Sequence, residues 1–281
     1  MPVRVVTDST CDLPPAVAAE HAITVVPAVI NVGERSYQDG VDLSREAFYR
    51  QLPGLTRLPT TAAPAPGAFA DVYRQLAAEG ADAIVSIHLA GSLSGLLNSA
   101  RLGAAMIEDL PIHVFDSGQL SLGLGLLALG AARAAAAGRA SADILAQLEA
   151  EAGRTHVVAA LESLEYVRRS GRVSWLQFGL GTLLDIKPLL QVHRGEVRLV
   201  ERVRTSRRAL ERLGEVVAGL GPLQEAALLH IRAADKLDAF RAQAGALLPA
   251  GRPLLAVEAT PVIGVHVGPG TLGVACIAAE G

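Results

Sequence analysis

Residues 84–100 read I-V-S-I-H-L-A-G-S-L-S-G-L-L-N-S-A, and this stretch predicts a strand, a turn and a helix in succession. Residues 84–89 form a short apolar run typical of a buried strand, and a helical pattern begins at Leu96. Between them, residues 90–95 are rich in glycine and serine. In an open α/β sheet such a turn lies at the carboxyl end of a strand, where ligands usually bind.

The same turn carries groups that an anion needs. Ser92 and Ser94 offer hydroxyl donors, and Gly95 lets a ligand approach the backbone. The first free N–H groups of the following helix also favour negative charge. Serine and glycine begin helices for purely structural reasons too, so the turn alone leaves an anion site and a plain helix start equally open.

Strands and helices alternate over the first half of the chain. The predicted strands cover residues 3–6, 24–32, 84–89 and 111–115. The predicted helices cover residues 45–51, 67–79, 120–137 and 141–153, and two more helices begin near Pro14 and Leu96. Ser44, Ser141 and either Ser9 or Asp12 are the predicted capping residues. Alternation of this kind indicates a parallel, doubly wound sheet.

After Gly153, hairpin turns mix with helices, which favours a mixed sheet. The predicted strands cover residues 156–161, 186–192, 197–203, 226–231, 254–259 and 273–278, and the predicted helices cover residues 162–169, 206–218 and 234–247. Residues 175–184 are apolar, and residues 260–272 separate the last two strands. The sequence therefore predicts an α/β protein with two domains, a parallel-sheet domain at residues 1–154 and a mixed-sheet domain at residues 155–281.

The composition favours an extensive core and argues against several classes of partner. The chain is 51% hydrophobic with a mean hydropathy of +0.35, which suits sheets buried on both faces. A net charge of −3 argues against general nucleic-acid binding. Residues 120–137 contain glycine and arginine and indicate a buried helix rather than a membrane span. Two cysteines without metal or redox spacing, and no secretory signal, favour a cytoplasmic protein.

Two further segments carry candidate binding residues. Residues 58–67 are too rich in proline for a helix or a central strand, and such a rigid segment can hold the Thr61 hydroxyl in a fixed place. His266 lies between two valines and before a Gly-Pro-Gly turn, so its ring faces either a cleft or the core. A plain connection and a core histidine are the structural alternatives for these segments.

Other chemistries lack their signatures. The sequence has no phosphate-binding loop of the nucleotide hydrolases, no HExxH and no clustered Cys or His ligands, so we expect no cofactor and no metal. Asp8 and Asp116 follow predicted strands, where capping of the next helix is favoured over catalysis. The remaining hydroxyls, one histidine and a very apolar chain suit an amphiphile, with its head group on the hydroxyls.

Eight motifs occur in one order along nearly the whole chain. They read V-T-D-S-T-C-D-L-P at 6–14, Y-Q-D-G-V-D-L-S at 37–44, P-T-T-A-A-P-A-P-G-A-F at 59–69, S-I-H-L-A-G-S-L-S-G at 86–95, D-S at 116–117, S-G-R-V-S at 170–174, I-K-P-L-L at 186–190 and V-I-G-V-H-V-G-P-G at 262–270. In these motifs the chain resembles the DegV family, the fatty-acid-binding proteins that serve bacterial fatty-acid kinase.

The resemblance implies a two-domain fold related to one domain of dihydroxyacetone kinase, with a long-chain fatty acid such as palmitate between the domains. The family's carboxylate-binding hydroxyls correspond to Thr61 and Ser94, with His266 beside them. Ser92 and Gly95 complete the predicted fatty-acid-binding set. A partner kinase is implied to hold ATP and to phosphorylate the carboxylate on the way to phospholipid synthesis. Arg172 is the candidate contact with that kinase or its phosphate.

The chain also departs from the family pattern. S-G-L-L-N-S-A replaces the usual S-G-T-Y-Q-S-A, so Leu96-Leu97 stands where the family has a threonine and an aromatic residue. Ala90-Gly91 replaces a pair of serines. We expect these replacements to reshape the pocket. Two alternatives to a non-catalytic carrier stay open. One is a stand-alone hydrolase or acyl transferase that uses Ser94 and His266, and the other is a scaffold with an empty cleft.

Overall fold

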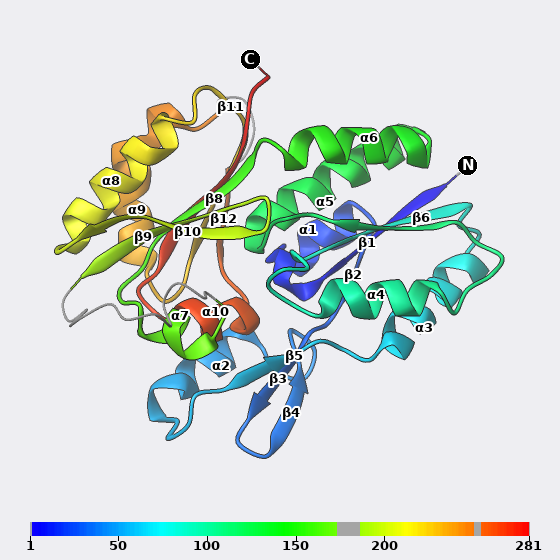
Figure 1. The fold of residues 1–281 in the computed structure, drawn as a ribbon, viewed down its shortest axis with the longest axis horizontal. Coiled ribbons are helices and arrows are strands. Elements are labelled where there is room, and N and C mark those ends of the chain that lie inside the picture. The colour runs from blue at the N-terminus through cyan, green and yellow to red at the C-terminus, as the bar shows by residue number, and fades with distance from the viewer. Residues whose placement is uncertain (1, 173–185, 250–253, 281) are drawn as a thin grey trace.

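The computed structural model describes residues 2–172, 186–249 and 254–280, and the apolar stretch at 175–184 lies outside them. Four parallel strands form a first sheet in the order β2-β1-β6-β7 (Figure 1). They are β1 (Val3–Asp8), β2 (Ile23–Val26), β6 (Ala83–His88) and β7 (Ile112–Asp116). Every residue of β6 is buried, as expected for a parallel strand covered on both faces.

Helices cover both faces of this sheet, so the predicted doubly wound α/β arrangement is confirmed. One side carries α3 (Pro66–Ala78) and α4 (Leu96–Ala104), and the other carries α5 (Ser121–Ala136) and α6 (Ser141–Ala152) (Figure 1). The short η1 (Ser9–Cys11) and α1 (Pro15–Glu20) connect β1 to β2. The predicted caps are only partly correct. Ser44 caps α2, whereas α1 and α6 begin after Pro14 and Ala140 without a side-chain cap.

The second sheet has six strands in the order β10-β9-β8-β13-β11-β12. Only β11 and β12 pair in parallel, so the predicted mixed sheet is confirmed. The strands are β8 (Thr155–Ala160), β9 (Lys187–His193), β10 (Glu196–Val203), β11 (Leu223–His230), β12 (Leu255–Glu258) and β13 (Leu272–Ala278). The helices of this half are α7 (Glu165–Ser170), α8 (Ser206–Ala218), α9 (Ala234–Ala244), η4 (Gly245–Leu247) and α10 (Pro261–Val267).

A third, antiparallel sheet of three strands in the order β4-β3-β5 was not predicted. Its strands are β3 (Val29–Val32), β4 (Arg35–Gln38) and β5 (Thr60–Ala62), with α2 (Arg45–Gln51) and η2 (Leu52–Gly54) between β4 and β5. The single strand predicted at residues 24–32 is therefore wrong. Pro27 has no N–H to continue a ladder, and the chain leaves the first sheet there and enters the third.

Helix α5 lies between the two large sheets and contacts strands of both (Figure 1). Leucine, alanine and glycine surround its axis, which is typical of a helix buried on all sides. A Cβ on Gly123 would lie 2.6 Å from Val157 Cγ2 of β8, and one on Gly125 would lie 2.5 Å from the Cys11 carbonyl oxygen. In the described residues no helix has the length and apolar character needed to cross a membrane.

Candidate ligand-binding site

A cavity of about 280 Å³ is lined by strands of the second and third sheets, by the serine turn that follows β6 of the first sheet, and by α10. Its wall is mostly alanine, leucine, valine and isoleucine. Alternate residues of β8 and β9 point into it, because side chains of a strand alternate between faces. These residues are Val157, Ala159, Leu190 and Val192. The lining contains few side chains with polar atoms: Thr61, Ser94, Ser170, Arg172, His266 and Thr271.

The structure brings Thr61 and His266 together across 205 residues of sequence. Thr61 lies on β5, at the edge of the third sheet, and His266 lies on α10 in the segment predicted only to separate two strands. Thr61 Oγ1 is 2.8 Å from His266 Nε2, and His266 Nδ1 is buried with no partner among the described residues. In either tautomer of a neutral ring the pair keeps one spare donor, the Thr61 hydroxyl or Nδ1–H.

The imidazole of His266 is neutral at physiological pH. Burial lowers the pKa of His266 to about 4, and the positive charge of Arg172 acts in the same direction. The Thr61–His266 pair therefore offers a hydrogen bond rather than a charge. A carboxylate accepts such bonds and has no donor of its own, so it matches the spare donor.

Ser94 and Gly95 also belong to the cavity lining. Ser94 Oγ accepts a hydrogen bond from Leu96 N at 3.3 Å, which leaves its O–H free to donate. Gly95 is the residue before α4, and a Cβ there would make only an ordinary contact with Ala63. Close packing of the protein therefore does not require glycine at this position.

Ser92 lies outside the cavity lining, unlike its neighbour Ser94. Its hydroxyl donates to the Gly195 carbonyl at 2.6 Å, and Gly195 N donates to the Gly118 carbonyl at 2.7 Å. Ser92 thus connects the serine turn to the β9–β10 hairpin. Its partner is 103 residues away, which sequence spacing could not have indicated.

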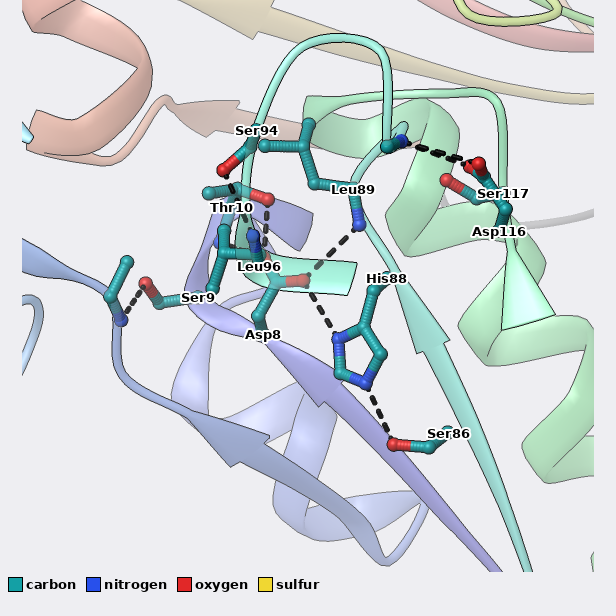
Figure 2. A network of polar contacts seen from close by, with 12 residues as sticks. Asp8, Ser9, Thr10, Ser86, His88, Leu89, Ser94, Leu96, Asp116 and Ser117 are labelled. Carbon is teal, nitrogen blue, oxygen red and sulfur yellow. Dashed lines mark hydrogen bonds and ion pairs between the residues drawn. The ribbon is translucent and has the colours of Figure 1, made fainter. Parts of the chain in front are cut away.

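Two carboxylates hold the serine turn in place (Figure 2). Asp8 caps η1 through Thr10 and accepts from Leu89 N at 3.2 Å, and His88 Nδ1–H donates to it at 3.0 Å. Asp116 accepts from Gly118 N at 3.0 Å and from Gly91 N at 3.3 Å. Capping is confirmed for Asp8 but not for Asp116, which binds the loop before α5 and the serine turn instead.

Comparison with known proteins decides the family. A family model described as "Uncharacterised protein, DegV family" matches residues 2–279. This chain belongs to the DegV family. A DegV domain-containing protein of Streptomyces coelicolor is 37% identical over 275 residues, which is 97% of each chain.

Two solved DegV structures resemble this one closely. One, described as fatty acid binding, comes from Thermus thermophilus and has a TM-score of 0.90 at 31% identity, covering 99% of this chain and 100% of that one. The other is DegV of Bacillus subtilis, described as a fatty acid binding protein, with a TM-score of 0.88 at 29% identity over 99% of each chain. The expected α/β fold, with one parallel and one mixed sheet as in DegV proteins, is confirmed.

Arg172 of this DegV protein is exposed and also lines the cavity. It follows α7, and its Nη1 donates to the Ser170 carbonyl at 2.5 Å. Val173 and Ser174, the rest of its motif, lie outside the described residues. A guanidinium at the edge of a cavity can contact both a ligand head group and a molecule that approaches from solvent.

The placement of α10, which carries His266, depends on residues that sequence reasoning did not single out as functional. Thr260 N donates to Asp12 Oδ1 at 2.6 Å, and Tyr49 Oη donates to the Ala259 carbonyl at 2.9 Å. Asp12 has a φ of 59° and also accepts a hydrogen bond from Ser121 Oγ. Asp12 was, with Ser9, one of two residues expected to cap α1, and the structure uses it to join α5 and α10 instead.

The site offers binding groups rather than an activated nucleophile. Within the described residues, the Ser94 hydroxyl makes no hydrogen bond with His266, whose Nε2 is engaged by Thr61. A serine nucleophile needs a base within hydrogen-bond reach. The described residues also contain no group of three or more His, Cys, Asp or Glu that could hold a metal ion.

Proposed function

We propose that this protein binds one long-chain fatty acid and presents its carboxylate to a separate kinase in the cytoplasm. The observation that carries the proposal is an apolar cavity with a neutral donor pair, Thr61–His266, and the free Ser94 hydroxyl in its lining. The acyl chain gains roughly 0.8 kcal/mol for each methylene it buries. The fatty acid binding described for the Thermus thermophilus and Bacillus subtilis relatives supports this assignment.

Thr61, Ser94 and His266 are the proposed carboxylate ligands. Gly95 borders them, and Ser92 is not included because its hydroxyl is bound to Gly195. Leu96 and Leu97 are buried at the start of α4, and Leu96 lines the cavity. The apolar side chain of Leu96 therefore contributes to the wall of the pocket rather than to its polar end.

Native mass spectrometry of freshly purified protein, followed by solvent extraction, tests the binding. We expect a discrete added mass of a fatty acid on the wild type and its loss in the Thr61→Ala/Ser94→Ala double variant. The matched control is Thr60→Ala/Ser99→Ala, which makes the same changes outside the lining, on β5 and on the helix α4 that follows Ser94. The proposal would be overturned if the wild type is purified without a bound fatty acid and does not bind added palmitate or oleate.

The kinase step is tested separately. The kinase would transfer the γ-phosphoryl group of ATP to a carboxylate oxygen, which releases ADP and leaves an acyl phosphate. We expect a purified fatty-acid kinase catalytic subunit to form this product only from the loaded protein, measured as the hydroxamate after trapping with hydroxylamine. Arg172→Ala should lower product formation by protein that is loaded with the same amount of fatty acid, whereas Arg207→Ala, at an exposed position of α8, should leave product formation unchanged. Equal rates with both variants would remove Arg172 from the proposal.

A further inference from the structure

Asp39 is a buried carboxyl group that the proposed binding site does not use. It follows β4 and is 3% exposed, and within the described residues neither side-chain oxygen has a hydrogen-bond partner of ordinary geometry, although the hydroxyls of Ser9 and Thr260 lie close enough to stabilise its ionised form. Its backbone is fixed, because Asp39 N donates to the Ala28 carbonyl at 2.9 Å and Asp39 forms an isolated β-bridge with Leu43. Buried polar atoms nearly always have partners, so this exception requires an explanation.

Three titratable side chains face Asp39. Asp12 lies on the turn after η1, and Arg45 and Tyr49 lie on α2. Arg45 directs its guanidinium to backbone carbonyls, with Nη1 donating to Glu258 O at 2.6 Å and Nη2 to Asp12 O at 3.3 Å. Asp39 therefore has a second carboxyl group nearby, while the described contacts of the Arg45 guanidinium go to backbone carbonyls rather than to Asp39.

The residues around Asp39 also hold α10. Thr260 precedes this helix and donates its N–H to Asp12. Its hydroxyl lies near Asp39 and has no hydrogen-bond partner of ordinary geometry in the part of the chain that the structure describes. Tyr49 Oη donates to the Ala259 and Thr260 carbonyls, and a Cβ on Gly264 would lie 2.2 Å from that oxygen. Helix α10 contacts η1, α2, β3 and β5, so elements from the first part of the chain position it (Figure 1).

We propose that Asp39 is a positioning residue, and that its neutral form holds α10 and His266 in the geometry that binds a carboxylate. The inference rests on the proposed function, because affinity for a fatty acid is its readout. A neutral carboxyl does not repel Asp12 and has an O–H to donate. An ionised carboxylate in this dry position requires water or a counter-ion, and α10 must shift to admit either.

The charge state of Asp39 changes in the neutral range. Burial raises the pKa of Asp39 to about 7, and the Asp12 carboxyl acts in the same direction. The Ser9 hydroxyl, the Arg45 guanidinium and the Thr260 hydroxyl oppose this shift. His266 itself does not titrate there, because burial lowers its pKa to about 4. Fatty-acid affinity is therefore expected to fall as the pH rises through neutrality.

The test is the dissociation constant of a fluorescent long-chain fatty acid between about pH 6 and pH 8 at constant ionic strength. If binding needs one proton on Asp39, wild-type affinity falls by about tenfold over this range. The affinity of Asp39→Asn is expected to change by less than about twofold over the same range. The matched control is Asp42→Asn, three residues along on the exposed surface, which should follow the wild type.

A pH dependence of Asp39→Asn equal to that of the wild type would overturn the inference. If that variant does not fold, the carboxyl ¹³C resonance of Asp39 in the wild type decides the matter. A midpoint between about pH 6 and pH 8, accompanied by shifts of the amide signals of residues 261–267, supports the proposal, and a midpoint near 4 refutes it. A wild type that binds fatty acid equally at every pH refutes only this inference, whereas no binding at any pH refutes the proposed function.

Discussion

Gly268→Ala is the sharpest test of how the head-group site is built. Gly268 follows α10 with a φ of 80° and a ψ of 165°, a conformation that is nearly exclusive to glycine. A Cβ there would lie 2.4 Å from Tyr166 Cδ2 on α7. The strained backbone costs about 1–3 kcal/mol, and the steric overlap costs about 1–3 kcal/mol more.

The matched control is Gly171→Ala. Gly171 also has a positive φ, 68°, but apart from its two chain neighbours no atom of the described residues lies within 4 Å of the position that a Cβ would occupy. We expect the control to lose roughly 1–2 kcal/mol of the free energy of unfolding, and Gly268→Ala to lose about 2–6 kcal/mol. Urea denaturation measures both losses, and fatty-acid affinity should fall further in Gly268→Ala because α10 carries His266. Equal stability losses in the two variants would refute the packing of α7 on α10.

Three further predictions concern separate contacts. Asp39→Asn should raise the free energy of unfolding by up to about 4 kcal/mol at pH 8 and should leave it nearly unchanged at pH 4, as measured by urea denaturation at the two pH values. The reason is that the folded-state pKa of Asp39, about 7, lies above the ordinary 3.8, so ionisation of the carboxyl destabilises the wild type as the pH rises between these values. Ser92→Ala should cost roughly 1 kcal/mol of stability, measured by denaturant unfolding, because the hydrogen bond to Gly195 is lost. Leu190→Ala should enlarge the cavity and shift the bound acids toward longer chains, and an unchanged acid profile after extraction would contradict the role of Leu190 in the wall.

The sequence predicted the two large sheets because their strands and helices have strong periodic patterns. The third sheet escaped prediction, since β4 is short and β3 was merged with β2 despite Pro27. Helix α10 escaped for a related reason, because apart from His266 its seven residues are apolar, with a glycine in the middle, and show no amphipathic period. The division at residue 154 stays a prediction, because α5 precedes it and yet packs on strands that follow it.

The residues of the candidate site could be predicted where a sequence motif contains them, but not where their role depends on contacts between distant parts of the chain. Thr61, Ser94 and His266 were singled out from their own segments, and the resemblance to DegV proteins then assigned them to the carboxylate. The structure places all three in one cavity lining. Ser92 looked equivalent to Ser94, but a backbone carbonyl distant in sequence engages it. Asp39 lies in the motif at residues 37–44, but the motif does not reveal that its carboxyl is buried, because burial is a property of the folded chain.

The shared helix α5 has a consequence for how the molecule unfolds. Its glycines bring β8 and the turn after β1 within contact distance of one helix axis, so each large sheet depends on the same buried surface. Separating the sheets would expose a helix that has almost no polar face to present to water. The two halves should therefore melt in a single cooperative transition, and a fragment ending at residue 154 should aggregate rather than fold by itself.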